Sequence, residues 1–202
     1  MPLQNRVTPF GDIVATAHRG RFTGNRGIIH DPATRTLLNR RWSSKAWITC
    51  TCEFRGRRRK VMSRRSWTEL FFLDEATSFA AGHRPCFYCR RNDAEAFRDA
   101  WAKGNRRDIP RAPEMDSVLH AERLDGKAKR LHTLRVPLAA LPNGAMVTSG
   151  GESYLIANGE TWLWSFAGYR RASAELPDVR LLTPPSIVNA LRAGYPAQMA
   201  LD

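Results

Sequence analysis

Residues 68–91, TELFFLDEATSFAAGHRPCFYCRR, contain the pattern that decides the fold of this part of the chain. The first five residues, among them Thr68, Phe71 and Phe72, predict a strand. Asp74 is a typical N-cap residue, so we expect a helix to begin there and to end at Gly82. The chain then reaches Cys86-x-x-Cys89, a spacing that is typical of metal ligands at a turn leading into a helix.

A second pair of cysteines, Cys50-x-Cys52, lies upstream in an alternating stretch that we interpret as one strand of a hairpin, with the return strand at residues 60–62. A tetrahedral zinc site needs four ligands, and the two pairs together supply four thiols. Metal ligation is favoured over disulfide bonds in a reducing compartment, and a C-x-C pair does not easily bridge itself. The sequence therefore predicts a structural zinc ion held by Cys50, Cys52, Cys86 and Cys89.

The geometry of a strand leaves an alternative open for the first pair. The strand must end or bulge at these residues for a C-x-C pair to wrap around one ion. If only one member of the pair ligates, His30 or His83 is the most plausible replacement.

Within residues 68–91, the run FFLDEATSFAAGHRPCFYC resembles the metal-binding domain of the Ada family of DNA alkylation-repair proteins. That domain has a Phe-rich strand, an acidic and alanine-rich helix and an RPC-x-x-C run. The resemblance implies a zinc module with Cys86 and Cys89 as ligands and Arg84 facing DNA phosphate. In that family the first pair is C-x-x-x-C, whereas here it is C-x-C, and no methyltransferase or helix-turn-helix motif follows. The resemblance thus implies DNA contact and a zinc fold, and not methyl transfer.

The charge of the chain points to a polyanionic partner. Lys and Arg number 32 against 19 Asp and Glu, giving a formal net charge of +13. Such an excess attracts nucleic acid through counterion release, and we expect DNA as the partner. The candidate nucleic-acid contacts lie between and around the two cysteine pairs, and are Arg55, Arg57, Arg58, Arg59, Lys60, Arg64, Arg65, Arg84 and Tyr88.

Length and composition predict an α+β protein of one compact domain, residues 1–202. We expect a zinc and DNA-contact module at 46–91, a helical segment at 92–126, and an antiparallel sheet with a terminal helix at 127–202. No apolar run is long enough to span a membrane, and the N-terminus has no secretory h-region, so we expect a cytoplasmic protein with no membrane partner. A monomer is the favoured state.

Local signals place the remaining elements. Residues 1–45 show no sustained periodicity and are interpreted as irregular chain. Asn92 and Glu95 form a capping-box pattern for a helix that ends at Gly104, and Asn158-Gly159 is a hairpin signal. Further elements are expected as a helix at 114–124, strands at 133–136, 145–148, 153–156 and 161–166, and a helix beginning at Thr183-Pro184.

Two places outside the cysteines could carry catalysis. Removal of the initiator methionine would expose Pro2 as a secondary amine able to attack a deoxyribose C1′ and form an iminium. In this respect the chain resembles the Fpg/Nei glycosylases, which also begin with Pro after Met and carry a zinc finger, although Leu3 replaces their following acidic residue. The second place is a helix on which Asp116 and His120 are four residues apart and share a face, with Glu122 nearby.

These features together favour a DNA-binding zinc protein that processes DNA, as a DNA glycosylase or repair-type enzyme acting on damaged or modified bases, with or without lyase action. The alternative is a non-catalytic DNA-binding or regulatory zinc protein. The two differ in one structural requirement, because a glycosylase needs a pocket that admits a flipped base, whereas a binding module does not.

Overall fold

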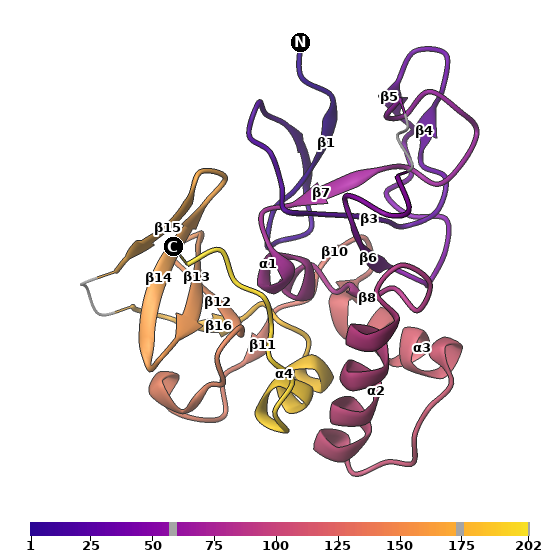
Figure 1. Ribbon diagram of the computed structural model, residues 1–202. Helices are drawn as coiled ribbons and strands as arrows, with labels where there is room; N and C mark the ends of the chain where they lie inside the picture. The colour runs from indigo at the N-terminus through magenta and orange to yellow at the C-terminus, as the bar shows by residue number, and fades with distance from the viewer. Residues whose placement is uncertain (57–59, 173–175, 202) are drawn as a thin grey trace.

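The computed structural model of the protein describes residues 1–56, 60–172 and 176–201. This part of the chain has a mixed α+β fold in which two six-stranded sheets and three α-helices surround a central short helix, α1 (Figure 1). The helices are α1 (Glu75–Ala80), α2 (Arg91–Asn105), α3 (Ala112–Arg123) and α4 (Pro185–Arg192), and a 3₁₀ turn spans Leu138–Ala140. The α+β class predicted from the sequence is confirmed at this level.

The first sheet has the strand order β2-β1-β7-β3-β6-β8. Its strands are β1 (Gln4–Val7), β2 (Ile13–Ala15), β3 (Phe22–Asn25), β6 (Ile48–Thr51), β7 (Leu70–Phe72) and β8 (Arg84–Pro85). Two small ribbons are separate from it, β4 (His30–Asp31) with β5 (Thr36–Leu37), and β9 (Leu124–Asp125) with β10 (Ala128–Lys129).

Residues 1–45 were expected to be irregular chain, and this prediction is wrong, because they supply β1 to β5. These strands have two to four residues each, too few for a period to be visible. Gly24 lies inside β3, where a Cβ atom would come within 2.2 Å of the Ile48 carbonyl oxygen. Gly24 is therefore needed because the backbones of two strands come too close for a side chain there, and not because the chain forms a loop.

The predicted hairpin between residues 47–54 and 60–62 is also wrong. Strand β6 pairs with β3, antiparallel, and with β8, parallel. Met62 is instead a buried turn residue with φ of 54°. The local turn signal at Arg55-Gly56 is present as left-handed backbone, but the tertiary partners of β6 come from far away in the sequence.

The second sheet follows the sequence expectation more closely. Its order is β11-β16-β12-β13-β14-β15, and its strands are β11 (His132–Thr133), β12 (Met146–Ser149), β13 (Glu152–Ala157), β14 (Glu160–Ser165), β15 (Gly168–Arg171) and β16 (Arg180–Leu181). Asn158 and Gly159 join β13 to β14 with φ of 54° and 74°, as a two-residue hairpin requires.

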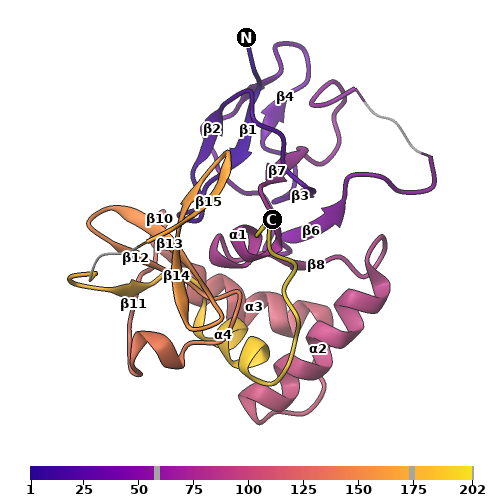
Figure 2. The same cartoon turned by 60° about the vertical axis from the view of Figure 1, so that its left-hand side comes forward.

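Both faces of the second sheet are buried. Val147 and Ile156 point into a core formed with α2, α3 and α4, whereas Met146 and Leu155 pack against α1 on the other face. The first sheet has its own core around Phe72, which includes Ala81 at the end of α1. Helix α1 therefore lies between the two sheets and packs on both (Figure 2).

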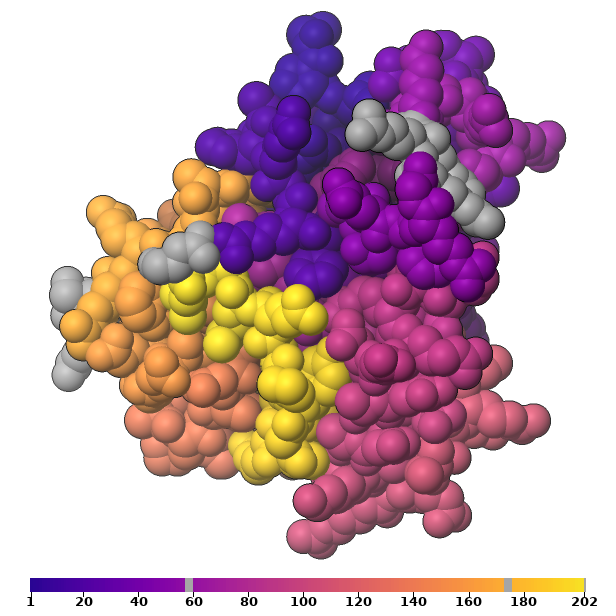
Figure 3. Space-filling model, viewed as in Figure 1, coloured from indigo at the N-terminus to yellow at the C-terminus, as the bar shows by residue number. Residues whose placement is uncertain are grey.

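Two adjacent carboxylates at the start of α1 hold the segment that follows α4. Asp74 caps the helix by accepting from Thr77 N at 2.8 Å, and it also accepts from Ala200 N at 2.9 Å. Glu75 accepts from the Tyr195 hydroxyl at 2.9 Å and forms an ion pair with Arg90 at 2.7 Å. Burial raises the pKa of both carboxyls. The chain after α4, yellow in Figure 3, runs along the seam between the second sheet and α2.

Helix α2 begins without the predicted capping box. Its N-cap is Arg90, which makes no side-chain cap hydrogen bond, and its guanidinium contacts Asp93 and Glu75. Among the described residues, no helix is long and apolar enough to cross a membrane.

Candidate functional site

Three thiols meet where the first sheet joins α2. Cys50 lies on β6, and Cys86 and Cys89 lie in the turn between β8 and α2. The three sulfur atoms are all within 4.8 Å of one another. The parallel pairing of β6 with β8 brings them together, because Cys86 N donates to Thr49 O at 3.0 Å, next to Cys50.

The three thiols are close enough to change one another's pKa values. The pKa of Cys86 is lowered by a hydrogen bond with Cys50 and then by one with Cys89, so this sulfur is the preferred thiolate. The same hydrogen bond with Cys86, followed by that with Cys89 and by burial, raises the pKa of Cys50 well above its ordinary value. Thiolates this close repel one another, so a cation that replaces their protons would stabilise the cluster, and sulfur ligands suit thiophilic metals such as zinc.

Cys52 does not join the cluster, so the four-cysteine site predicted from the sequence is reduced to three thiols. Cys52 is exposed, and its sulfur lies 3.4 Å from Arg21 O. Strand β6 ends at Thr51, so Cys52 lies just beyond the strand that carries Cys50. The histidine alternatives are also elsewhere. His30 contacts Thr68 Oγ1 at 2.7 Å, and His83 is fully buried beside Arg26.

A cavity of about 320 Å³ opens beside the thiol cluster. We call it the thiol cavity. Its size falls within the range of about 300–1,000 Å³ that is usual for small-molecule sites. Its lining includes the four cysteines, the aromatic residues Phe54, Trp67, Phe71 and Tyr88, and the polar residues Thr23, Asn25, Thr51 and Glu69.

The walls of the thiol cavity come from two sources. Strands β3, β6 and β7 form the floor, and the segment between β6 and β7 contributes Phe54, Val61 and Trp67. Glu69 is buried directly before β7 and accepts from Met62 N at 2.9 Å, which ties this segment to the sheet. The cavity is thus built on a sheet, and Phe54, Val61 and Trp67 form another part of its wall.

An aromatic pair forms the rim between this cavity and an open groove of about 750 Å³. Tyr88 is 61% exposed, and its ring meets that of Phe54 edge-on at 5.2 Å. The guanidinium of Arg55 lies over both rings, 5.0 Å from the Phe54 centroid and 5.8 Å from that of Tyr88. Arg91 lines the groove from the start of α2.

The predicted nucleic-acid contacts differ in their exposure to solvent. Those exposed to solvent are Arg55, Lys60, Arg64, Arg65 and Tyr88, whereas Arg57, Arg58 and Arg59 lie outside the described residues. Arg84 does not face solvent. It is 4% exposed and forms a bidentate ion pair with Asp116, at 2.7 Å from Nε to Oδ1 and 2.8 Å from Nη2 to Oδ2.

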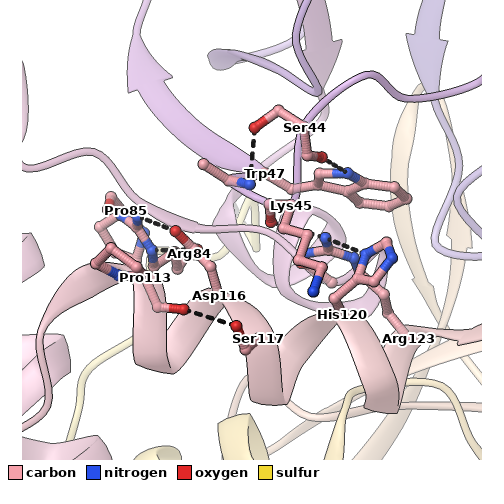
Figure 4. A network of polar contacts seen from close by, with 12 residues as sticks. Ser44, Lys45, Trp47, Arg84, Pro85, Pro113, Asp116, Ser117, His120 and Arg123 are labelled. Atoms are coloured by element: carbon pink, nitrogen blue, oxygen red, sulfur yellow. Dashed lines mark hydrogen bonds and ion pairs between the residues drawn. The ribbon is translucent and has the colours of Figure 1, made fainter.

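Helix α3 does not present the carboxylate–histidine pair expected from its spacing (Figure 4). Asp116 is buried and engaged by Arg84. His120 Nδ1 instead contacts Arg123 Nη2 at 2.9 Å, and burial followed by the charge of Arg123 lowers the pKa of its imidazole. Glu122 accepts from Ser186 N at 3.1 Å and Ser186 Oγ at 2.6 Å at the start of α4. Asp116 and Glu122 thus join α3 to other elements, and His120 is held by a contact within α3.

Pro2 is exposed and precedes β1. It is not among the residues that line the thiol cavity or the adjoining groove. Sequence reasoning missed other residues of the cavity, chiefly Asn25, Glu69 and Phe71. The position of Glu69 directly before an apolar strand could have marked it, because a carboxylate is seldom buried there without a partner or a role.

Comparison of the chain with protein-family models, with curated proteins and with solved structures gave no match. A functional role must therefore be inferred from the residues of the site. Three features stand together at one end of the first sheet: a three-thiol cluster, a cavity with aromatic walls, and a rim that carries exposed arginine and tyrosine.

Proposed function

We propose that the protein is a zinc-binding, DNA-processing enzyme of the glycosylase or repair type that takes a damaged or modified base into the thiol cavity. The observation that carries this proposal is the aromatic-lined cavity directly beside Cys50, Cys86 and Cys89. A flipped base is held by stacking on aromatic side chains and by hydrogen bonds to its polar edge. The cavity offers Phe54, Trp67 and Phe71 for the first and Asn25 for the second.

Cys50, Cys86 and Cys89 would hold the zinc ion at the wall of the thiol cavity. A metal held there would supply Lewis-acid activation of water at neutral pH. Glu69 provides a carboxylate on the same cavity wall that can take up a proton. Hydrolytic excision adds water across the N-glycosidic bond, with hydroxide joined to C1′ and the proton delivered to the departing base.

The rim fits the phosphate backbone and neighbouring bases of an opened duplex. Tyr88 is exposed beside Phe54, so a base can stack on it. Arg55 and Arg91 lie along the groove on the far side of this pair and can contact phosphates. The positive net charge of the chain supports the same class of partner.

The alternative is a DNA-binding zinc protein without catalysis. It is favoured by the structural roles of Asp116, His120 and Glu122, which leave only Pro2 of the sequence-predicted catalytic residues without such a role. In this alternative the thiol cavity serves recognition alone.

Excision is tested by incubating the protein with duplexes that carry different modified or damaged bases and then treating with alkali to reveal abasic sites. We expect cleavage at one class of modified base. Glu69→Gln keeps an acceptor for Met62 N–H and is expected to lower the excision rate by about 100-fold or more, as for loss of a general base. Glu152→Gln, an exposed change on the second sheet, serves as the matched control and should not alter the rate.

Three outcomes separate the alternatives. Full activity in Glu69→Gln would exclude this carboxylate, and trapping by borohydride that an N-terminal tag abolishes would place the chemistry on Pro2. DNA binding without excision on any modified duplex would favour the binding module.

The contribution of Arg57, Arg58 and Arg59 to DNA binding is tested separately. Replacing Arg57, Arg58 and Arg59 with alanine removes three positive charges between the cysteine pairs. We expect weaker binding to all DNA sequences alike, and a slope of log affinity against log salt that is smaller by about 0.9 for each phosphate that the variant no longer neutralises. Fluorescence anisotropy at several salt concentrations measures the slope. An unchanged slope would mean that these arginines do not bind DNA phosphates.

A further inference from the structure

A second cavity, of about 260 Å³, lies away from the thiol cavity and shares no lining residue with it. It is formed by the turn between β1 and β2, the chain after β3, the loop that precedes β6, the end of α3 and the β9–β10 ribbon. The charged residues that line it are Asp12, Arg26, Arg41, Arg123, Lys127 and Lys129. We call it the basic cavity.

Two of its arginines are buried in contact with one tryptophan. The guanidinium carbon of Arg26 lies 3.9 Å from the centre of the Trp47 ring, and that of Arg123 lies 3.8 Å from it. The exposed fractions of Arg26 and Arg123 are 2% and 1%. These cation–π contacts stabilise the positions of both guanidiniums without neutralising their charges.

The hydrogen bonds of these arginines are incomplete. Arg26 donates from Nε to His83 Nε2 at 3.3 Å and from Nη1 to Gly11 O at 2.9 Å. Arg123 donates from Nη1 to Gly82 O at 3.0 Å and from Nη2 to Lys45 O at 2.8 Å, and Nη2 also contacts His120 Nδ1 at 2.9 Å. Within residues 1–56, 60–172 and 176–201, Arg26 Nη2 and Arg123 Nε are buried and have no hydrogen-bond acceptor. A buried charged donor without an acceptor is costly, so these two N–H groups favour an acceptor beside them.

A third cation faces the same space. Lys129 lies on β10 and donates to Ala80 O. Burial, followed by the charges of Arg26 and Arg123, lowers the pKa of this amine to about 7. The pKa of each arginine is lowered to about 9, again chiefly by burial. The charges of Arg26 and Arg123 therefore destabilise the charged form of Lys129, and the charge of Arg123 destabilises that of Arg26.

The negative charges near these cations do not balance them. Among the described lining residues, Asp12 is the one carboxylate, and it is exposed. Asp116 also acts on Arg123, but both of its oxygens already accept from Arg84. On the rim, Arg41 and Lys127 add two further exposed cations. The cavity therefore has an excess of positive charge.

We infer that the basic cavity binds a phosphate dianion, either inorganic phosphate or the terminal phosphate of a small phosphomonoester. Arg26, Arg123 and Lys129 line the space, and one buried nitrogen of each guanidinium has no acceptor among the described residues. Phosphate offers several strong acceptor oxygens and two negative charges, and each of these N–H groups can donate to it in a charge-assisted hydrogen bond. The inference does not depend on the proposed DNA-processing function, because the two cavities are separate.

Binding is measured by isothermal titration calorimetry of the full chain with inorganic phosphate, at constant ionic strength set with sodium chloride. We expect saturable binding at one site per chain. Lys129→Gln should weaken the affinity by about 10-fold or more, as for loss of one charged hydrogen-bond donor. Lys103→Gln makes the same change of charge at an exposed position on α2 and should leave the affinity unchanged.

A second variant covers the case in which Lys129→Gln does not fold. Arg41→Ala with Lys127→Ala removes the two exposed rim cations and should weaken phosphate binding by a few fold without loss of the fold. Equal effects of chloride and phosphate, or equal affinity in all variants, would overturn the inference. A trinucleotide with a 5′ phosphate and the same trinucleotide without it then distinguish the sources. Competition by the phosphorylated form alone identifies a phosphomonoester, and competition by neither identifies free phosphate.

Discussion

Replacing Cys86 with serine is expected to reduce bound metal from about one ion per chain to nearly none, because it removes one of the three sulfur ligands of the cluster. A metal that binds only the folded chain stabilises it by several kcal/mol or more, and we expect a matching decrease in the free energy of unfolding. Elemental analysis of protein purified without added metal measures the first effect, and urea denaturation measures the second.

The chain contains its own control for this experiment. Cys52 is two residues from Cys50 and lines the same cavity, but its sulfur lies outside the cluster. Cys52→Ser should keep the full metal content. If Cys52→Ser lost the metal and Cys50→Ser kept it, the ligand set inferred from the structure would be wrong. A metal content near zero in the unsubstituted protein, with the fold intact, would remove the metal site altogether.

Replacing Asp116 with asparagine is expected to lower the free energy of unfolding by about 3–5 kcal/mol, because it leaves the buried guanidinium of Arg84 without its counter-charge. Both partners are almost fully buried, with side-chain exposures of 5% and 7%. The pair joins β8 to α3 and so fixes the strand that leads into Cys86. Urea denaturation monitored by circular dichroism measures the change.

Two further variants separate a lost ion pair from a general disturbance of α3. Ser117→Ala changes an exposed neighbour that donates to Pro113 O, and should alter stability by less than about 0.5 kcal/mol. Arg84→Met combined with Asp116→Leu removes both charges and should recover much of the loss, since a buried pair can be replaced by apolar residues. Equal stabilities of Asp116→Asn and the unsubstituted protein would exclude a structural role for the pair.

The local signals of the sequence were sufficient for some elements of the fold. The Asp74 cap begins α1, Asn158-Gly159 forms the turn between β13 and β14, and α4 follows Pro184. Each of these depends on backbone preferences of a few adjacent residues, which is why it can be predicted. The first sheet could not be, because its neighbours β1 and β7, or β6 and β8, are far apart in the sequence.

The site was predictable to the same extent. Cys86-x-x-Cys89 is a local spacing, and both cysteines belong to the cluster. The choice of Cys50 over Cys52 depends on how β6 meets β8, and that is fixed only by tertiary pairing. The position of Arg84 was predicted wrongly for another reason. The resemblance to the Ada-type domain implied that Arg84 faces DNA phosphate, whereas an acidic partner 32 positions away holds it in the interior.

The hydrogen bonds between the start of α1 and the chain after α4 affect the order of folding. Asp74 and Glu75 accept from residues that follow them by 126 and 120 positions, Ala200 and Tyr195. During synthesis these two hydrogen bonds cannot form until residues 195–200 have left the ribosome, so the helix between the sheets cannot reach its final environment early. Closing a loop of this length is slow compared with forming local contacts. We therefore expect the hairpins of the second sheet to form first, and the two sheets to lock together in the last step of folding.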